Sequence, residues 1–292
     1  MASPVSRRLS LKPTLDGLYN SFNLADSAID PIQFVRRYTR NDDREVVAFC
    51  AAGLAFGRVA SIMHSIQRVV EVMGPHPAAL VRDFDPARDG RALRDFVHRW
   101  IRGADVVALL WVLHQMLASA GSLEGFFLEG DEGGDDVRDA LDSFSRRAMA
   151  LDLRAAYGLV PARPGVAYFF PRPSGGSACK RLNLFMRWMV RRDALDLGVW
   201  TRVSPSRLIV PLDTHIIRVG RCLKLTRYTS PGWPMALDIT HALRLLDPAD
   251  PVKYDFSVCH LGMMNACGFE TPRGNANCPL KAVCAPRRRR AL

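Results

Sequence analysis

The sequence predicts an all-α protein, and three observations support this fold class. Apolar residues recur at helical spacing along most of the 292 residues. Almost no stretch alternates apolar and polar residues, as a half-buried strand would. Proline and glycine fall between the apolar segments, where they end helices. The chain contains no internal repeat, and we expect about ten helices.

The first half gives four predicted helical segments. Asn41–Asp42–Asp43 is a capping sequence before residues 45–73, an apolar-rich segment that Gly53 and Gly57 interrupt and that Pro75 ends. The acidic stretch GDEGGDD at 130–136 caps a later helix or forms a loop. The other helices are expected at residues 95–101, 104–118 and 136–151.

The second half begins with a loop over residues 157–177, which are rich in proline and glycine. An amphipathic helix is expected over 178–192, with Leu182, Phe185 and Met189 on one side. A linker follows at 193–212. The remaining predicted helices cover residues 214–225, 233–246 and 253–267, before a cysteine-bearing coil and a basic tail.

Positive charge is concentrated in the second half of the chain. The sequence has 40 basic and 29 acidic residues, a net charge of +11. Residues 1–172 contain 21 of each and are neutral, whereas residues 173–292 contain 19 basic and 8 acidic residues. This asymmetry indicates a polyanionic partner for the second half.

The composition argues against several classes of protein. An apolar fraction of 48% is too high for a disordered chain. The longest apolar run, residues 106–120, is shorter than the roughly 18–20 residues of a membrane span, so we expect no membrane partner. Seven cysteines and no apolar signal segment favour a reducing, cytoplasmic location. We expect a monomer. The Arg/Ser-rich N-terminus leaves a nuclear or organellar location open.

The segment PLDTHIIRV at 211–219 is the first candidate for chemistry. Aspartate is among the best helix N-cap residues, so capping alone explains Asp213. The alternative is a carboxylate that is held at a helix start, faces a cleft, and stabilises a developing cation or activates a nucleophile. The sequence leaves both interpretations open.

The segment PSGGSACKR at 173–181 is the second candidate. Gly175 and Gly176 precede a helix, where backbone N–H groups suit a phosphate. Lys180, in the first turn, is one of only five lysines among the 40 basic residues. Lysine can act as an amine nucleophile and arginine cannot, so each lysine stands out. A solvated lysine after a turn is the simpler explanation.

The third candidate is a set of C-terminal cysteines. Cys267, Cys278 and Cys284 are spaced as in part of an iron–sulfur or zinc loop. Cys259 precedes Cys267 by eight residues, about 12 Å of helix rise, which is too far for one metal. We therefore expect three ligands within reach of one another.

Together these segments resemble the helix-hairpin-helix DNA glycosylase superfamily, which includes endonuclease III and the 8-oxoguanine glycosylases. Residues 211–219 are similar to its catalytic stretch, and residues 260–267 to its His-Gly helix ending in a cluster cysteine. The resemblance covers about residues 174–284 and places the chain in a separate branch. Lys180 and Asp213 are 33 positions apart, farther than in endonuclease III, so residues 193–212 resemble an insertion. The family's second cluster cysteine falls near Asn275.

The resemblance implies roles for these residues. Asp213 would be the carboxylate that acts at the glycosidic carbon, and Lys180 would attack C1′ as an amine and cleave the strand. A cluster of iron and sulfur, or zinc, would bind the C-terminal cysteines. The partner would be duplex DNA, and the activity would be removal of a damaged, possibly oxidised, base. The residues implied in DNA binding are Gly175, Gly176, Ser177, Arg181, His215 and Arg218.

The resemblance also implies a two-lobed helical fold. Residues 31–200 would form a barrel-like lobe with the hairpin. Residues 1–30 and 201–292 would form a second lobe with the Asp213 helix and the Cys-bearing loop. Most aromatic residues in a helical protein belong to the core, and the sequence does not show which of them reach a pocket. The candidates for stacking on an extruded base are Phe169, Phe170, Trp188, Trp200 and Trp233.

Two other functions remain open at this point. The chain could be a non-catalytic DNA- or RNA-binding protein on the same scaffold, with Asp213 kept as a cap. It could also be a metal-binding protein that uses the C-terminal cysteines for redox chemistry or structure.

Overall fold

The computed structural model describes residues 4–24, 30–263 and 278–284. These residues form fifteen α-helices, four short 3-10 helices and one two-stranded hairpin. The prediction of an all-α protein is confirmed. The 3-10 helices are η1 (Gly90–Leu93), η2 (Gly165–Phe169), η3 (Pro173–Gly175) and η4 (Pro205–Arg207).

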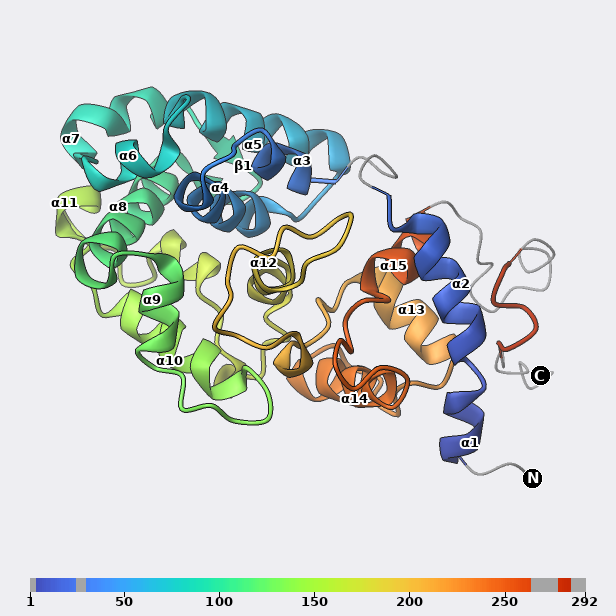
Figure 1. Cartoon of the computed structure of the whole chain (residues 1–292). Coiled ribbons are helices and arrows are strands. Elements are labelled where there is room, and N and C mark those ends of the chain that lie inside the picture. Colours follow the sequence, from blue (N-terminus) through green and yellow to red (C-terminus); the bar gives the residue numbers. More distant parts are fainter. Residues whose placement is uncertain (1–3, 25–29, 264–277, 285–292) are drawn as a thin grey trace, which may run out of the picture.

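The helices gather in two groups, with α12 (Lys180–Val190) between them (Figure 1). α12 packs against α4 of the first group. The first group contains α3 (Ile32–Arg36), α4 (Asn41–Leu54), α5 (Val59–Met73), α6 (Pro77–Arg82), α7 (Pro86–Asp89), α8 (Gly103–Ala120), α9 (Leu123–Leu128), α10 (Arg138–Met149) and α11 (Arg154–Tyr157). The second contains α1 (Pro4–Leu9), α2 (Lys12–Phe22), α13 (Thr214–Cys222), α14 (Trp233–Arg244) and α15 (Asp255–Met263).

Two helices form the centre of the first group. In α4 every residue from Glu45 to Leu54 is buried, including the charged Glu45. Its carboxylate accepts the backbone N–H groups of Leu123 and Glu124, at the start of α9, and the indole N–H of Trp200. α8 is long and apolar enough to cross a membrane, but 61% of it is buried inside the protein, as in a core helix.

The N-terminal helix α2 belongs to the second group, although it is far from that group in sequence. Leu15 and Leu18 of α2 are buried, and α2 packs against α15. Asp16 accepts a hydrogen bond from the Tyr254 hydroxyl over 2.7 Å and forms an ion pair with Lys253. Residues from both ends of the chain therefore build one side of the molecule.

The predicted helix over residues 95–101 is wrong. A hairpin of β1 (Val97–His98) and β2 (Ile101–Arg102) lies there, with Arg99 at a φ of 55° in its turn. Long-range contacts explain the difference, because the buried His98 ring bonds to the Phe56 carbonyl and to the Ser65 hydroxyl. A helix would break both bonds.

The other predicted helices are present, with ends shifted by a few residues. The interruption predicted within 45–73 lies between α4 and α5, where Gly57 has a φ of 109°. Residues 157–177 are loop apart from short helical turns. Of the predicted helix over 253–267, α15 is the described part, and residues 264–267 lie outside the described residues.

Candidate functional site

The glycine turn before α12 is the first part of the candidate site. Gly176 requires glycine because its φ is 79°, whereas Gly175 lies in open space. The N–H of Gly175 donates to the Arg172 carbonyl, and that of Gly176 to the Pro173 carbonyl. The two glycine amides are therefore occupied within the turn, and neither is available to a phosphate in this conformation.

The next two residues provide the amides that the glycines do not. The N–H groups of Ser177 and Ala178 find no acceptor among the described residues. The Ser177 hydroxyl accepts the N–H of Cys179, which has a φ of 48° and precedes α12 directly. On the other side of the turn, Ser174 N–H donates to Asp142 of α10 and anchors the turn there. The segment that leads into the turn is the 3-10 helix η2, not an α-helix.

Lys180 is the first residue of α12 and is half-buried. Its Nζ donates to the carbonyl of Ala55, the residue after α4, over 3.1 Å. Among the described residues no carboxylate forms an ion pair with Lys180, whereas Lys12 and Lys253 are both paired with Asp16. The ammonium therefore keeps donors free for a ligand.

Arg181 is occupied within the protein. Its guanidinium donates to the carbonyls of Gly53 and Tyr168 and lies 3.4 Å from the centre of the Tyr168 ring. Burial lowers the pKa of this guanidinium to about 10. The side chain predicted to bind DNA thus also holds the loops after α4 and at η2 together.

Three aromatic rings next to Arg181 form what we call the aromatic patch: Phe56, Tyr168 and Trp100. Their ring centres lie 4.9 to 5.1 Å apart. Trp100, in the turn of the hairpin, is 52% exposed. The hairpin and the loop 55–58 carry arginines and no acidic residue. The patch is therefore apolar, cationic and open to solvent.

The aromatic residues chosen from the sequence are not in the patch. Phe169, Phe170, Trp188, Trp200 and Trp233 are each no more than 3% exposed, so this choice was wrong as these residues stand in the core. Trp100 was missed because it lies in the segment predicted as a helix. Its neighbours Arg99 and Arg102, in a run with no acidic residue, are the sequence signal that could have indicated it.

Asp213 is the N-cap of α13, and its side chain also makes a contact outside the cap. Its Oδ1 accepts the N–H of Ile216 over 2.7 Å, which is the expected cap bond. Its Oδ2 takes no part in the cap and lies 3.1 Å from the Sγ of Cys259 in α15. The residue as a whole is half-buried.

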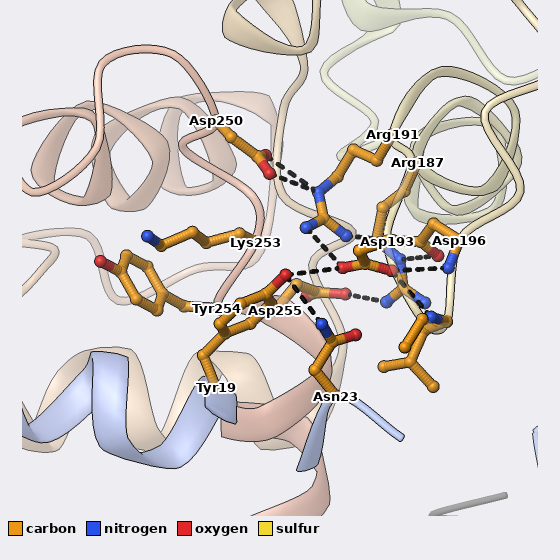
Figure 2. Close-up of polar contacts among 12 residues, drawn as sticks. Tyr19, Asn23, Arg187, Arg191, Asp193, Asp196, Asp250, Lys253, Tyr254 and Asp255 are labelled. Carbon is orange, nitrogen blue, oxygen red and sulfur yellow. Dashed lines mark hydrogen bonds and ion pairs between the residues drawn. The ribbon is translucent and has the colours of Figure 1, made fainter. Parts of the chain in front are cut away.

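Figure 2 shows a buried ionic cluster at the C-terminal end of α12, and one of its members, Asp255, interacts electrostatically with Asp213. Arg187 binds Asp255 over 2.5 Å and Asp196 over 3.2 Å. Arg191 binds Asp196 as well, and also Asp193 and Asp250 over 2.8 and 2.9 Å. Tyr19 of α2 donates to Asp193. We call Arg187, Arg191, Asp193, Asp196, Asp250 and Asp255 the α12 ionic cluster.

The pKa shifts in this cluster follow from burial and charge. Burial raises the pKa of Asp255 to about 6, against the opposing charge of Arg187, and the nearby Asp213 carboxylate raises it further. Burial alone would lower the pKa of Arg187, but Asp196 and Asp255 outweigh it and keep the pKa above the usual value. Both arginines are therefore cations that belong to the protein interior.

Lys180 begins α12, Asp213 lies near the other end of this helix, and no hydrogen bond or ion pair joins the two side chains. Lys180 and Arg187 are seven residues apart, close to two turns, so they share one side of the helix about 10 Å apart. Asp213 lies near the Arg187 end, since it acts electrostatically on Asp255, which Arg187 binds. A substrate between them would meet an amine at one end and a carboxylate at the other.

The remaining predicted site residues differ in burial and in their contacts. His215 is half-buried and its Nδ1 has no hydrogen-bond partner among the described residues, while Arg218 is exposed on α13. Cys278 and Cys284 flank a turn, with the Cys284 Sγ 3.9 Å from the Cys222 carbonyl. Cys267 lies outside the described residues. Within the described part of the chain, no three side chains of His, Cys, Asp or Glu are grouped as metal ligands.

Comparison with known proteins gives one match. A family model with the description "Protein of unknown function (DUF2400)" matches residues 30–264. No curated protein and no solved structure matches the chain. The match includes Lys180, Asp213 and Cys259, and it ends before Cys267. Because it covers more than half of the 292 residues, the chain belongs to the DUF2400 family.

Proposed function

We propose that the protein is a DNA glycosylase that removes a damaged base and cleaves the strand at the resulting abasic site. The single observation that carries the proposal is a pair of half-buried groups, one at the start of α12 and one near the Arg187 end of that helix. One is Lys180, which has no ion pair among the described residues, and the other is Asp213, which has one oxygen outside its cap. The proposal includes a two-lobed, glycosylase-like fold in which the glycine turn and α12 act as the hairpin.

Asp213 would stabilise the cation that forms on the sugar when the base leaves. Cleavage of the glycosidic bond gives its electron pair to the base and leaves positive charge on C1′ and the ring oxygen. A fixed carboxylate lowers the energy of that charge, since it needs no reorganisation during the reaction. Its Oδ1 is fixed by the Ile216 N–H, so the group is held in place before the substrate arrives.

Lys180 would then act as the amine nucleophile. The neutral amine adds to C1′ of the open-chain abasic sugar, water leaves, and an imine forms between Nζ and C1′. Loss of a C2′ proton then expels the 3′ phosphate and breaks the strand. Among the described residues, the Ala55 carbonyl is the acceptor that Nζ gives up in order to reach C1′.

Two other features favour a DNA substrate. The excess of basic residues in 173–292 suits a polyanion, and the free amides of Ser177 and Ala178 suit one of its phosphates. The aromatic patch presents an exposed indole beside arginines, and aromatic rings of this kind stack on unpaired bases. The patch and Lys180 flank the same loop after α4, so a displaced base and its sugar would lie together.

The test is an assay on duplexes that carry 8-oxoguanine, uracil, an oxidised pyrimidine or an abasic site. We expect base release from at least one of them and, with borohydride present, a covalent protein–DNA adduct. Asp213→Asn should strongly reduce release, because asparagine keeps the cap but not the charge. Lys180→Gln should abolish the adduct. Absence of release and adduct across the whole panel contradicts the proposal.

Duplex binding with no reaction would support the alternative, a non-catalytic DNA- or RNA-binding protein on this scaffold. The metal predicted at Cys267, Cys278 and Cys284 stays a prediction, and no step above depends on it. Iron and zinc content of the purified protein, together with absorption near 400 nm, tests it directly.

A further inference from the structure

The Oδ2 atom of Asp213 contacts a thiol. The Sγ of Cys259 lies 3.1 Å away, within hydrogen-bond distance for a sulfur donor. Cys259 is on α15, which packs closely against α13. Each oxygen of the carboxylate therefore has its own partner, one from its own helix and one from the neighbouring helix.

The thiol is the donor in this contact. Burial raises the pKa of Cys259 well above its usual value, and the carboxylates of Asp213, Asp255 and Asp30 raise it further. A thiolate would face three anions with no cation bonded to it, so the sulfur keeps its proton. The S–H group can then donate to Oδ2 and leave the carboxylate its negative charge, whereas a lysine or arginine would neutralise that charge.

The groups that surround this contact are mostly acidic. Asp255 lies one turn before Cys259 on α15, and Asp30 precedes α3. Arg187 of α12 is the cation that binds Asp255, and it also binds Asp196. No basic side chain among the described residues forms an ion pair with Asp213. Within the described part of the chain, the thiol is thus the one side-chain donor to Oδ2.

We propose that Cys259 is a positioning residue for Asp213, whose thiol fixes the orientation in which the carboxylate faces the reacting sugar. This inference rests on the proposed glycosylase function and deepens it. Ile216 N–H fixes one oxygen and Cys259 S–H the other, so rotation about the Cβ–Cγ bond is blocked. A carboxylate held in this way meets the developing charge on C1′ without first having to turn.

The test compares Cys259→Ala with Cys259→Ser in single-turnover base release as a function of pH. Loss of one weak hydrogen bond should slow release by about 2- to 10-fold in the alanine variant. The acid side of its pH profile should move to higher pH, because the anion has lost a donor. Serine keeps a donor and should restore most of the rate and the profile. Cys50→Ala, which removes another buried thiol, from α4, should leave both unchanged.

A second readout does not depend on activity. The S–H stretching band of Cys259, identified by difference from the Cys259→Ala protein, should shift when Asp213 is changed to asparagine, which alters its acceptor. The inference is overturned if the wild type releases base and the alanine variant has the same rate and pH profile. It is also overturned if alanine and serine lower only stability, and by equal amounts. No release by the wild type would instead overturn the glycosylase proposal itself.

Discussion

The two ends of α12 differ in whether their basic side chains are paired with carboxylates. At the C-terminal end, Arg187 and Arg191 are buried and share four aspartates. At the N-terminal end, Lys180 is half-buried and bonds only to a carbonyl among the described residues. Burial of a cation is costly unless it is paired, so the paired end belongs to the fold. The unpaired end is available to a ligand.

The contrast between the two ends of α12 is tested most strongly at the buried, C-terminal end. Arg187→Met leaves Asp255 and Asp196 without one of their cations, and removal of one partner of a buried pair costs about 3–5 kcal/mol of unfolding free energy. Chemical denaturation measures it. The matched control is Arg192→Met, an exposed arginine next to the cluster, which should change stability by less than about 0.5 kcal/mol. Equal effects of the two substitutions would remove the distinction between the ends.

Asp213→Asn separates catalysis from capping. We expect base release to fall by roughly 10²- to 10³-fold, the loss typical of removing one group that stabilises transition-state charge. Stability should change by less than about 1 kcal/mol, because asparagine caps helices as well as aspartate does. Single-turnover release and denaturation, measured on the same preparation, give both quantities. A large loss of stability with unchanged release would make Asp213 a structural residue.

The pH dependence of stability should reveal the raised pKa of Asp255 at the buried, C-terminal end of α12. The pKa of Asp255 is raised to about 6, so between about pH 4 and 6 the folded state keeps a proton that the unfolded state releases. Stability from this group is therefore greatest at low pH and falls, by at most about 3 kcal/mol, as pH rises through 6. Denaturation curves from pH 4.5 to 7 should have a flatter pH dependence in Asp255→Asn. An unchanged slope would argue against a raised pKa.

Trp100→Ala tests the aromatic patch, which lies beside the N-terminal end of α12. Loss of one stacking partner should weaken binding to DNA with an unpaired base by roughly 5- to 100-fold, and binding to fully paired duplex much less. Trp100→Phe should keep most of the preference. Leu159→Ala, which removes another exposed apolar side chain, serves as the control. Equal weakening for paired and unpaired DNA would show that the aromatic patch does not recognise bases.

Features set by nearby residues were predictable from the sequence. The helical class and α10, α12, α13 and α14 follow from apolar spacing and breaks, and Asp213 was recognised as a cap from its type and place. These features depend on residues within one or two turns.

Features set by distant residues were not predictable. Cys259 bonds to Asp213 from 46 positions away, and Arg187 to Asp255 from 68. The hairpin at 97–102 depends on His98 reaching Phe56 and Ser65. Whether an aromatic residue lies in the core or on the surface depends on the same kind of contact, which explains why Trp100 was missed and Trp188 was chosen.

The proposed function depends most on Lys180 as the amine that attacks C1′. The most direct measurement is mass spectrometry of the peptide that borohydride links to an abasic-site duplex. We expect the modified residue to be Lys180. The label should be lost in Lys180→Gln and retained in Lys224→Gln, which changes an exposed lysine elsewhere in the chain. A label on another residue, or none in a protein that binds the duplex, would contradict it.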